Sequence, residues 1–524
     1  MIKNFMKRKT NIFGIQIADY LLIILGLSVF SAITLFTITK SSIWFDEAFG
    51  AYIIRFNFFD IAKYTAFDVH PPLYYWVLKL WSMFFGNSEL AIRSMSLLFG
   101  GISIVLGYLI TNRLFGRKAA RYSLLFLVLS PMLIRYSQEA RMYTMVVAIA
   151  MMATLFLLKA TESNKKTHWM VYGIFVGLGM WTHYFSAIIW IAHWVWRAYV
   201  IKCESSNKNF YQRFFSKEWK FTNLVALGIF VPWLPFFITQ LSIIQAFGFW
   251  IPPVTPNTVI NYLSNVIFYQ ESSQLTGWLA LYLIILFIGF IFIGHYVYKR
   301  MNKDRKKYYI LLIIISVFPI ILLFIMSLPP LRSSFVDRYL FTSSLFIAIY
   351  MGVTLSYCEN LFKSYYTYVI AILVAVAMVV GIGNVYQLGN FNKNTNSSNN
   401  TRQIIEKVKQ NSESKLPIIA GSPWLFYEAI FYSTADNPVY FIEPSEYEYG
   451  SLEMLKRNDQ FKIKDINSFV IQNPSFWYVI YSSEEKISGP CPNNNCKEIK
   501  RLIIKNPFNN EINYQAIKYQ TIGY

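Results

Sequence analysis

The sequence predicts an all-α polytopic membrane protein with about 11 transmembrane helices and a small C-terminal α/β domain. Of its 524 residues 55% are hydrophobic and only 15% are charged, whereas soluble domains have about 25% charged residues. Several apolar runs reach the roughly 20 residues that a helix needs to cross a bilayer. Residues 403–524, by contrast, have the composition of an ordinary globular domain.

The net charge of +20 is explained by membrane topology. The basic residues fall in short clusters between apolar runs, a pattern that marks cytoplasmic turns and contact with anionic lipid headgroups. We therefore expect membrane lipids as partners and no nucleic acid. The first apolar run is long enough to stay in the membrane, so no cleavable signal is expected.

The expected spans follow the chain in order. The first covers about Ile17 to Thr39, and the helix expected at Pro72–Phe85 is too short to span, so it is assigned to the outer interface. The later spans are expected at Glu89–Asn112, Ala119–Ile134, Ala140–Leu158, two within His168–Val200, Phe221–Leu241, Trp278–Tyr298, one ending near Leu328, Tyr339–Cys358 and Tyr366–Leu388.

Four basic clusters lie at alternate turns, within residues 113–121, 159–166, 202–220 and 299–307. By the positive-inside rule these turns are cytoplasmic. A multi-pass protein of the inner or plasma membrane is expected, with a cytoplasmic N-terminus and an extracytoplasmic C-terminal domain.

Three regions are expected along the chain: a transmembrane domain over 1–389, whose first extracytoplasmic loop is 40–88, an Asn/Ser-rich tether at 390–402, and an α/β domain over 403–524. In the last, Cys491 and Cys496 either form a local disulfide or stay free. The residue patterns predict strands at Leu416–Ala420, Val439–Ile442, Trp477–Tyr481 and Ile512–Lys518 and helices at Thr401–Gln410 and Ser451–Arg457.

The first outer loop carries the clearest candidate catalytic groups. Asp46 and Glu47 are adjacent, and Asp68 stands two residues before His70. Alternate side chains of an extended segment share a face, so Asp68 and His70 are expected to point the same way. The proline after His70 favours that extended geometry.

Further polar residues are expected on the same outer face of the membrane. Each alone has an ordinary explanation, such as an arginine that reaches the headgroups or a histidine satisfied at a helix end. Together they describe a pocket for an anionic, lipid-linked substrate, because guanidinium groups bind phosphate with two donors and a carboxylate accepts a proton from a hydroxyl. These residues are Arg135, Tyr136, Gln138, Glu139, Arg141, His183, Arg332, Arg338 and Tyr339.

Six motifs distributed along the chain are specific in combination. WFDEAF, DVHPPLYY, LAIRSMSLLFG, SPMLIRYSQEARMY, WTHY and DRYL together closely resemble the bacterial family 39 glycosyltransferases. These are relatives of the dolichyl-phosphate-mannose protein mannosyltransferases and of the lipid A aminoarabinose transferase. The resemblance covers about residues 15–390. It implies a GT-C fold, a polyprenyl-phosphate-sugar donor and an inverting single displacement in the first outer loop.

The resemblance assigns Asp46 as the general base and Glu47, Asp68 and His70 as supporting residues. The arginines then bind the donor phosphate, with Arg141 and Arg338 foremost and Arg135 and Arg332 as further candidates. Glu139 is expected to orient Arg141. Gln138, Tyr136, His183 and Tyr339 support this group.

The expected activity is that of a hexosyl- or pentosyltransferase whose acceptor is a lipid or polysaccharide of the cell envelope. Protein O-mannosylation is an alternative, but Leu73-Tyr74-Tyr75 follows His-Pro-Pro where the eukaryotic enzymes have Leu-Gly-Lys, and their luminal repeats have no counterpart. A transporter or flippase, or a non-catalytic scaffold, is a further alternative, although no internal repeat is evident. A divalent cation stays open, because the acids and His70 could bind one but match no defined metal motif.

Overall fold

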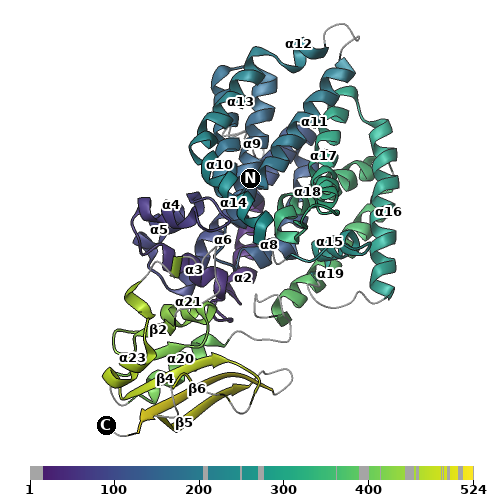
Figure 1. Ribbon diagram of the computed structural model, residues 1–524. Coiled ribbons are helices and arrows are strands. Elements are labelled where there is room, and N and C mark those ends of the chain that lie inside the picture. Colours follow the sequence, from purple (N-terminus) through teal and green to yellow (C-terminus); the bar gives the residue numbers. More distant parts are fainter. Residues whose placement is uncertain are drawn as a thin grey trace. The chain divides into compact units, whose positions relative to one another are not determined.

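The computed structural model describes residues 16–524 apart from 205–209, 248–250, 270–276, 362, 389–399, 413–414, 443–453, 456–458, 485–486, 488, 492–495, 506–510 and 523–524. Its contacts divide the chain into two compact units (Figure 1). The first comprises Met1–Thr37 and Arg93–Gln387, and the second Ile38–Ile92 and Leu388–Tyr524. The first outer loop, which the sequence assigned to the transmembrane domain, therefore shares a unit with the C-terminal domain.

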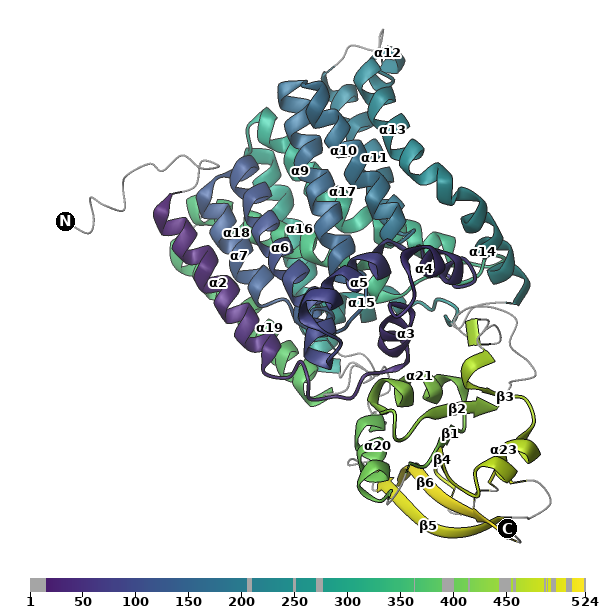
Figure 2. The same ribbon diagram turned by 90° about the vertical axis from the view of Figure 1, so that its left-hand side faces the viewer.

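The first unit is a bundle of long helices that run side by side (Figure 2). Its helix α6 begins in residues of the second unit and continues into the bundle without a break. The elements are α2 (Ile17–Leu35), α6 (Glu89–Phe115), α7 (Arg117–Val128), α8 (Pro131–Tyr136), α9 (Tyr143–Ser163), α10 (Lys166–Thr182), α11 (Ser186–Glu204), α12 (Phe210–Phe214), α13 (Lys217–Phe230), η2 (Val231–Trp233), α14 (Leu234–Phe247), α15 (Thr258–Ile267), α16 (Gly277–Arg300), α17 (Lys303–Met326), η3 (Asp337–Leu340), α18 (Phe341–Leu361) and α19 (Ser364–Leu388).

Every apolar run that was expected to span is helical, and eight helices within the described residues are long and apolar enough to cross a membrane. A multi-pass membrane protein is thus confirmed, but the count of about 11 is not. The expected span at Ala119–Ile134 is divided into α7 and α8 at Ser130-Pro131, where the Ser130 hydroxyl accepts from the Leu133 amide and starts a new helix. Helix α10 has only 17 residues, and α11 carries His193 and Arg197.

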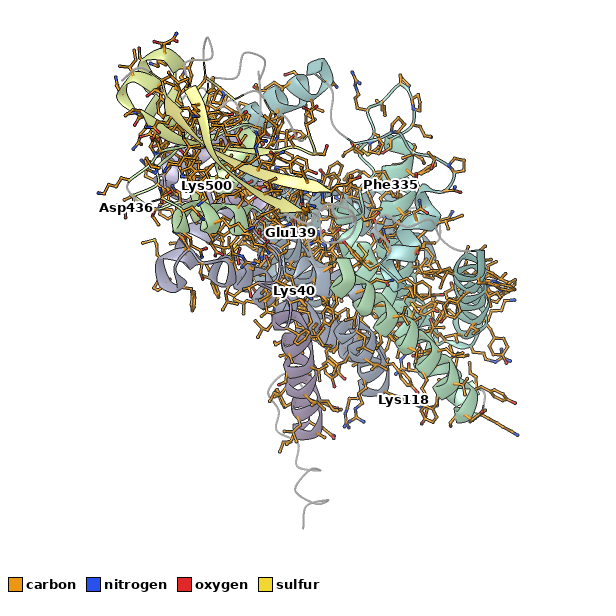
Figure 3. The ribbon with its side chains drawn as sticks, turned by 90° about the horizontal axis from the view of Figure 1, so that it is seen from below. Lys40, Lys118, Glu139, Phe335, Asp436 and Lys500 are labelled. Atoms are coloured by element: carbon orange, nitrogen blue, oxygen red, sulfur yellow. A yellow bond between two sulfur atoms is a disulfide. The ribbon has the colours of Figure 1, made fainter. Side chains whose placement is uncertain are left out.

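Ion pairs show which helix ends share one end of the bundle. Asp19, at the start of α2, accepts hydrogen bonds from Arg117 at 2.6 Å and Arg121 at 2.7 Å. Three further ion pairs join Arg113 to Glu162, Lys118 to Glu359 and Lys307 to Glu204. We call these ion pairs, together with those of Asp19, the ion-pair belt. Figure 3 shows Lys118 at the end of its helix and well away from Glu139. The basic turns therefore gather at one end, as the positive-inside pattern predicted.

The second unit combines the first-loop helices with a mixed α/β fold. Three of its strands pair in parallel, and a fourth parallel strand, β4, adjoins an antiparallel hairpin, giving the order β3-β2-β1-β4-β6-β5. Its elements are α3 (Phe45–Ile53), α4 (Phe58–Thr65), α5 (Leu73–Phe85), α20 (Thr401–Gln410), β1 (Ile418–Ala420), α21 (Pro423–Tyr432), β2 (Val439–Ile442), η4 (Asp459–Phe461), β3 (Lys462–Ile463), α23 (Ile466–Gln472), β4 (Ser475–Tyr481), β5 (Cys496–Lys505) and β6 (Ile512–Thr521).

The C-terminal α/β character agrees with the prediction, and all four expected strands are present. Strand β5 was missed because its first half reads Lys497-Glu498-Ile499-Lys500-Arg501, a charged run typical of an exposed edge strand. The expected tether falls mostly on 389–399, outside the described residues, and so does most of the helix expected at Ser451–Arg457. Cys491 and Cys496 form a disulfide, which decides the alternative that the sequence left open.

Candidate active site

The adjacent carboxylates of the first loop stand at the start of a helix. Asp46 and Glu47 occupy the first turn of α3, where the unpaired amides and the helix dipole favour negative charge. The Glu47 side chain is fully buried and accepts a hydrogen bond from the Trp44 amide at 3.4 Å. Asp46 stays partly exposed. The helix thus separates two neighbouring acids, with Glu47 held inside and Asp46 accessible to a substrate.

The second pair of first-loop residues meets as the spacing predicted. The His70 Nδ1 atom lies 3.2 Å from the Asp68 Oδ2 atom, and both side chains are largely buried. A carboxylate in this position fixes the orientation of the imidazole. The pair therefore behaves as one unit with a defined geometry.

An aromatic wall from the C-terminal domain covers α3. The Tyr427 ring packs edge-on against Phe45, Phe49 and Tyr52, with ring centroids 5.9, 5.7 and 5.3 Å away. Burial raises the pKa of Tyr427 well above its ordinary value, and the charge of Asp68 raises it further. Helix α21 therefore packs on the helix that carries Asp46 and Glu47.

Hydrogen bonds and an ion pair also tie the first loop to the same domain. The Ile43 amide donates to the Tyr432 hydroxyl at 2.6 Å, and that hydroxyl donates to Glu89. Arg402 forms an ion pair with Glu89 at 2.6 Å and donates to the Thr39 carbonyl oxygen at 3.1 Å. We call Glu89, Arg402 and Tyr432 the loop clamp, because they hold the chain just before α3.

In the first unit, the structure brings four of the expected residues into one aromatic cluster. The guanidinium carbon of Arg338 lies 5.6 Å from the centre of the Tyr143 ring and 5.9 Å from that of Tyr339. His183 contacts Tyr339 and Tyr143, at centroid distances of 4.9 and 6.2 Å. Tyr136 completes the cluster, 5.4 Å from Tyr143.

Tyr143, His183, Arg338 and Tyr339 of this cluster line a small cavity of about 10 Å³, which is space for about one water. Arg338 is only 9% exposed, and aromatic faces stabilise a cation that has lost most of its water. Residues from three distant segments thus place a desolvated guanidinium at one end of the bundle. That is the end opposite to the ion-pair belt, since η3 and Glu359 lie at opposite ends of the helix that begins at Phe341.

Arg135 and Glu139 form a buried ion pair beside this cluster, with an N–O distance of 2.7 Å and exposures of 4% and 1%. Glu139 was expected to orient Arg141; the pair with Arg135 gives it a further role, and its action on Arg141 stays a prediction. Arg141 is buried, and its carbonyl oxygen accepts from the Ser96 hydroxyl. The Gln138 side chain accepts from Thr37 at 2.7 Å.

Arg332 is the one expected phosphate ligand that the structure leaves apart. Its side chain is exposed, and within the described residues it makes no hydrogen bond or ion pair. The neighbouring Asp337 instead accepts from Asn265, which fixes the start of η3 and with it Arg338.

Sequence reasoning missed several residues of these clusters. Arg93 is fully buried near the start of α6, and an arginine inside an apolar run was the signal that could have found it. Tyr143 was part of a quoted motif but was not singled out. Tyr427 and Tyr432 gave no local signal, because their contacts are with residues more than 300 positions away.

No group of three or more His, Cys, Asp or Glu side chains that could hold a metal ion is found in the described part of the chain. Asp46, Glu47, Asp68 and His70 therefore fit no preformed metal centre there. The carboxylates of the first loop can accept a proton, and the buried arginines of the first unit can stabilise negative charge.

Known proteins were compared with this chain by sequence and by structure. Residues 69–236 match the family model described as dolichyl-phosphate-mannose-protein mannosyltransferase. No curated protein matches the chain. The family model confirms the resemblance to the family 39 glycosyltransferases that the six motifs indicated.

Among solved structures, ArnT from Cupriavidus metallidurans in the apo state is similar over 96% of this chain and 98% of its own, with a TM-score of 0.61 and 14% identity. The same protein bound to undecaprenyl phosphate gives a TM-score of 0.57 and 15% identity, over 94% of this chain and 97% of its own. At these identities the likeness concerns the fold.

Proposed function

We propose that this protein is an inverting glycosyltransferase that moves a sugar from a polyprenyl-phosphate donor to a cell-envelope acceptor on the extracytoplasmic face of the membrane. The observation that carries the proposal is the difference in burial between two adjacent acids on α3. Glu47 is buried and accepts a hydrogen bond from the Trp44 amide, whereas Asp46 is partly exposed. A general base must reach its substrate, and a fixed neighbour keeps it in place.

The reaction follows from these positions. The Asp46 carboxylate accepts the proton of an acceptor hydroxyl as that oxygen forms a bond to the anomeric carbon of the donor sugar. The bond from this carbon to the phosphate oxygen breaks at the same time, and the electron pair leaves with the polyprenyl phosphate. Attack from the side opposite to the leaving group inverts the configuration at the anomeric carbon. Asp68 and His70 orient the acceptor.

The departing phosphate needs cations. Arg338 and Arg141 are the proposed ligands, because a guanidinium offers two parallel donors to phosphate oxygens. Burial of Arg338 among aromatic rings supports this role, since a charge with little water gains most from an anionic ligand. The structure of ArnT bound to undecaprenyl phosphate supports a donor of this kind, because its fold is similar to that of this chain.

The test is sugar transfer by the purified protein with polyprenyl-phosphate sugars as donors. Asp46→Asn keeps the size of the side chain and removes the base, so kcat is expected to fall by about 10²- to 10⁴-fold. The matched control is Asp60→Asn, on α4 of the same loop. Its carboxylate accepts a hydrogen bond from the Asn57 side-chain amide at 2.7 Å, and its backbone amide donates to the Asn57 side-chain oxygen that caps the helix. Near-normal turnover by Asp46→Asn would remove Asp46 from the role of base.

A protein acceptor is the second candidate, because the matching family model describes protein mannosyltransferases. The segment after His70 differs from those enzymes, and its tyrosines Tyr74 and Tyr75 are fully buried in the second unit. Parallel assays with an envelope lipid, a polysaccharide and an unfolded polypeptide would separate these acceptors. Movement of the labelled donor between leaflets without a new glycosidic bond would instead indicate a flippase.

A further inference from the structure

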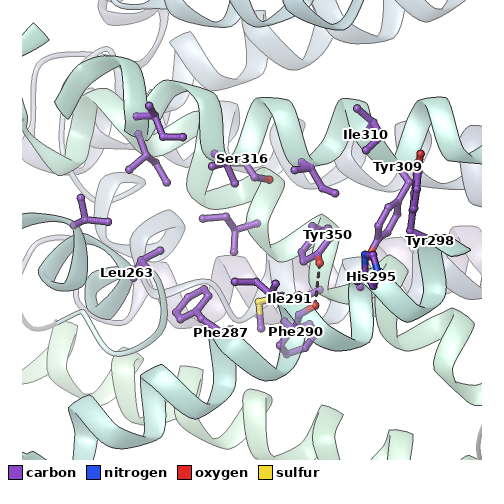
Figure 4. Close-up of a pocket in the computed structure, with 18 of the residues that line it drawn as sticks. Leu263, Phe287, Phe290, Ile291, His295, Tyr298, Tyr309, Ile310, Ser316 and Tyr350 are labelled. Carbon is purple, nitrogen blue, oxygen red and sulfur yellow. Dashed lines mark hydrogen bonds between the residues drawn. The ribbon is translucent and has the colours of Figure 1, made fainter. Parts of the chain in front are cut away.

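A large apolar cavity lies in the first unit, and none of the candidate site residues lines it. It has a volume of about 680 Å³ and is lined by α15, α16, α17 and α18 (Figure 4). Both α16 and α17 are long and apolar enough to cross a bilayer. Lining residues such as Ile291 and Ile321 are 65% and 52% exposed, so the cavity is open to the surroundings of the bundle. Those surroundings are lipid, so the hydrocarbon chain of a lipid can enter it.

Three polar lining residues lie together at one end of this cavity. Figure 4 shows His295, Tyr298 and Tyr309 together, with Leu263 and Phe287 toward the other end. The tyrosines bond to protein groups, for example Tyr298 to Tyr199 at 3.1 Å. His295 is exposed and makes no hydrogen bond to any residue that the structure describes. An ionisable side chain on a membrane helix is costly unless it meets a polar group, so His295 points to a ligand with a polar head.

The same end carries an excess of positive charge. Residues 299–307, which join α16 to α17, contain Lys299, Arg300, Lys303, Arg305, Lys306 and Lys307 but only one acid, Asp304. Lys307 lies 4.0 Å from both Asp304 and Glu204, and Arg305 donates to the Tyr357 hydroxyl. The Lys306 ammonium lies 5.2 Å from the centre of the Tyr298 ring, which lines the cavity. A negatively charged headgroup is therefore favoured here over a neutral one.

We infer that this cavity binds an acidic glycerophospholipid, with one acyl chain along α16 and α17 and the phosphate near His295 and Lys306. The donor lipid is a poorer occupant. Its phosphate is proposed to meet Arg338, and η3 and the turn at 299–307 lie at opposite ends of the bundle, since the ion-pair belt includes Lys307. The exclusion of the donor lipid rests on the proposed function, whereas the cavity, His295 and the basic turn are independent of it.

The test is lipid retention measured by native mass spectrometry, after the full-length protein is reconstituted in phosphatidylcholine bilayers doped with phosphatidylglycerol. One molecule of phosphatidylglycerol is expected to stay bound in preference to phosphatidylcholine. Lys306→Gln is expected to weaken this preference about fivefold, because one cation near a membrane surface contributes roughly 1 kcal/mol to the binding of an anionic lipid. His295→Leu removes the second polar contact and is expected to weaken it as well.

A pair of matched variants tests the cavity itself. Ile291→Trp fills it, whereas Ile285→Trp adds the same bulk to the same helix at an equally exposed position that does not line the cavity; the two side chains are 65% and 64% exposed. Retention is expected to fall only with Ile291→Trp. Equal retention by both variants, or equal retention of the two phospholipids by the unmodified protein, would overturn the inference. Displacement of phosphatidylglycerol by undecaprenyl phosphate at equal concentration would overturn it too.

Discussion

At the scale of single residues, two of the expected arginines differ in burial, and this difference bears on whether each can bind phosphate. Arg338 and Arg332 are six positions apart, and the sequence predicted both as phosphate ligands, with Arg338 the stronger candidate. Arg338 is buried against the Tyr143 and Tyr339 rings, while Arg332 is exposed. An ionic interaction is stronger where little water surrounds the charge. Of the two arginines, we therefore expect Arg338 to be the stronger phosphate ligand.

Arg338→Lys tests the need for a planar guanidinium. Lysine keeps the charge but cannot give two parallel hydrogen bonds to a phosphate. A charge-assisted hydrogen bond contributes about 1.5–3 kcal/mol, so kcat/KM for the donor is expected to fall by about tenfold or more. Steady-state kinetics at varied donor concentration measure this. The control is Arg113→Lys at the opposite end of the bundle, where lysine can keep the ion pair to Glu162. Equal kcat/KM values for the two variants would contradict the assignment.

At the scale of elements, periodicity predicted the helices well, because the apolar runs are long and bounded by basic turns. The spacing of Asp68 and His70 predicted their shared face, and the contact is present. The surroundings of α3 could not be predicted in this way. Its packing partner α21 lies more than 370 residues further along the chain, and no local pattern encodes so distant a contact. The catalytic assignments themselves rest on motifs and remain predictions.

The loop clamp gives an element-scale prediction. Tyr432→Phe removes the hydroxyl that accepts from the Ile43 amide and donates to Glu89, so the chain just before α3 loses a fixed point. We expect kcat to fall several-fold with the KM for the donor unchanged, and faster amide hydrogen exchange at Ile43. Because one hydrogen bond contributes only about 1 kcal/mol, the protein should stay folded.

Tyr440→Phe is the matched control, since Tyr440 lies on β2 of the same domain and its ring packs against Phe469. A purely structural role for Tyr432 would lower the melting temperature and leave kcat and the exchange at Ile43 as they are in the control. Tyr432 acts in this proposal as a positioning residue, because it reaches α3 only through the Ile43 backbone.

At the scale of the whole molecule, the cysteines provide a direct probe of topology. Of the four, Cys491 and Cys496 are bridged, Cys358 is buried and Cys203 is exposed at the end of α11, next to the basic segment 202–220. A membrane-impermeant maleimide should therefore leave intact cells unlabelled and label Cys203 once the membrane is opened. Mass spectrometry of the labelled peptide identifies the site. Labelling of Cys203 in intact cells would place this segment outside and reverse the proposed orientation.

The packing of α21 on α3 also bears on how the protein matures. A chain is made from its N-terminus, so the helix that carries Asp46 is complete long before the residues that cover it exist. Until Tyr427 arrives, Phe45, Phe49 and Tyr52 lack their aromatic cover. A segment synthesised late thus covers a helix that was synthesised early. A truncated or incompletely translocated chain would contain Asp46 and Glu47 but lack the aromatic surface of α21 that packs on their helix.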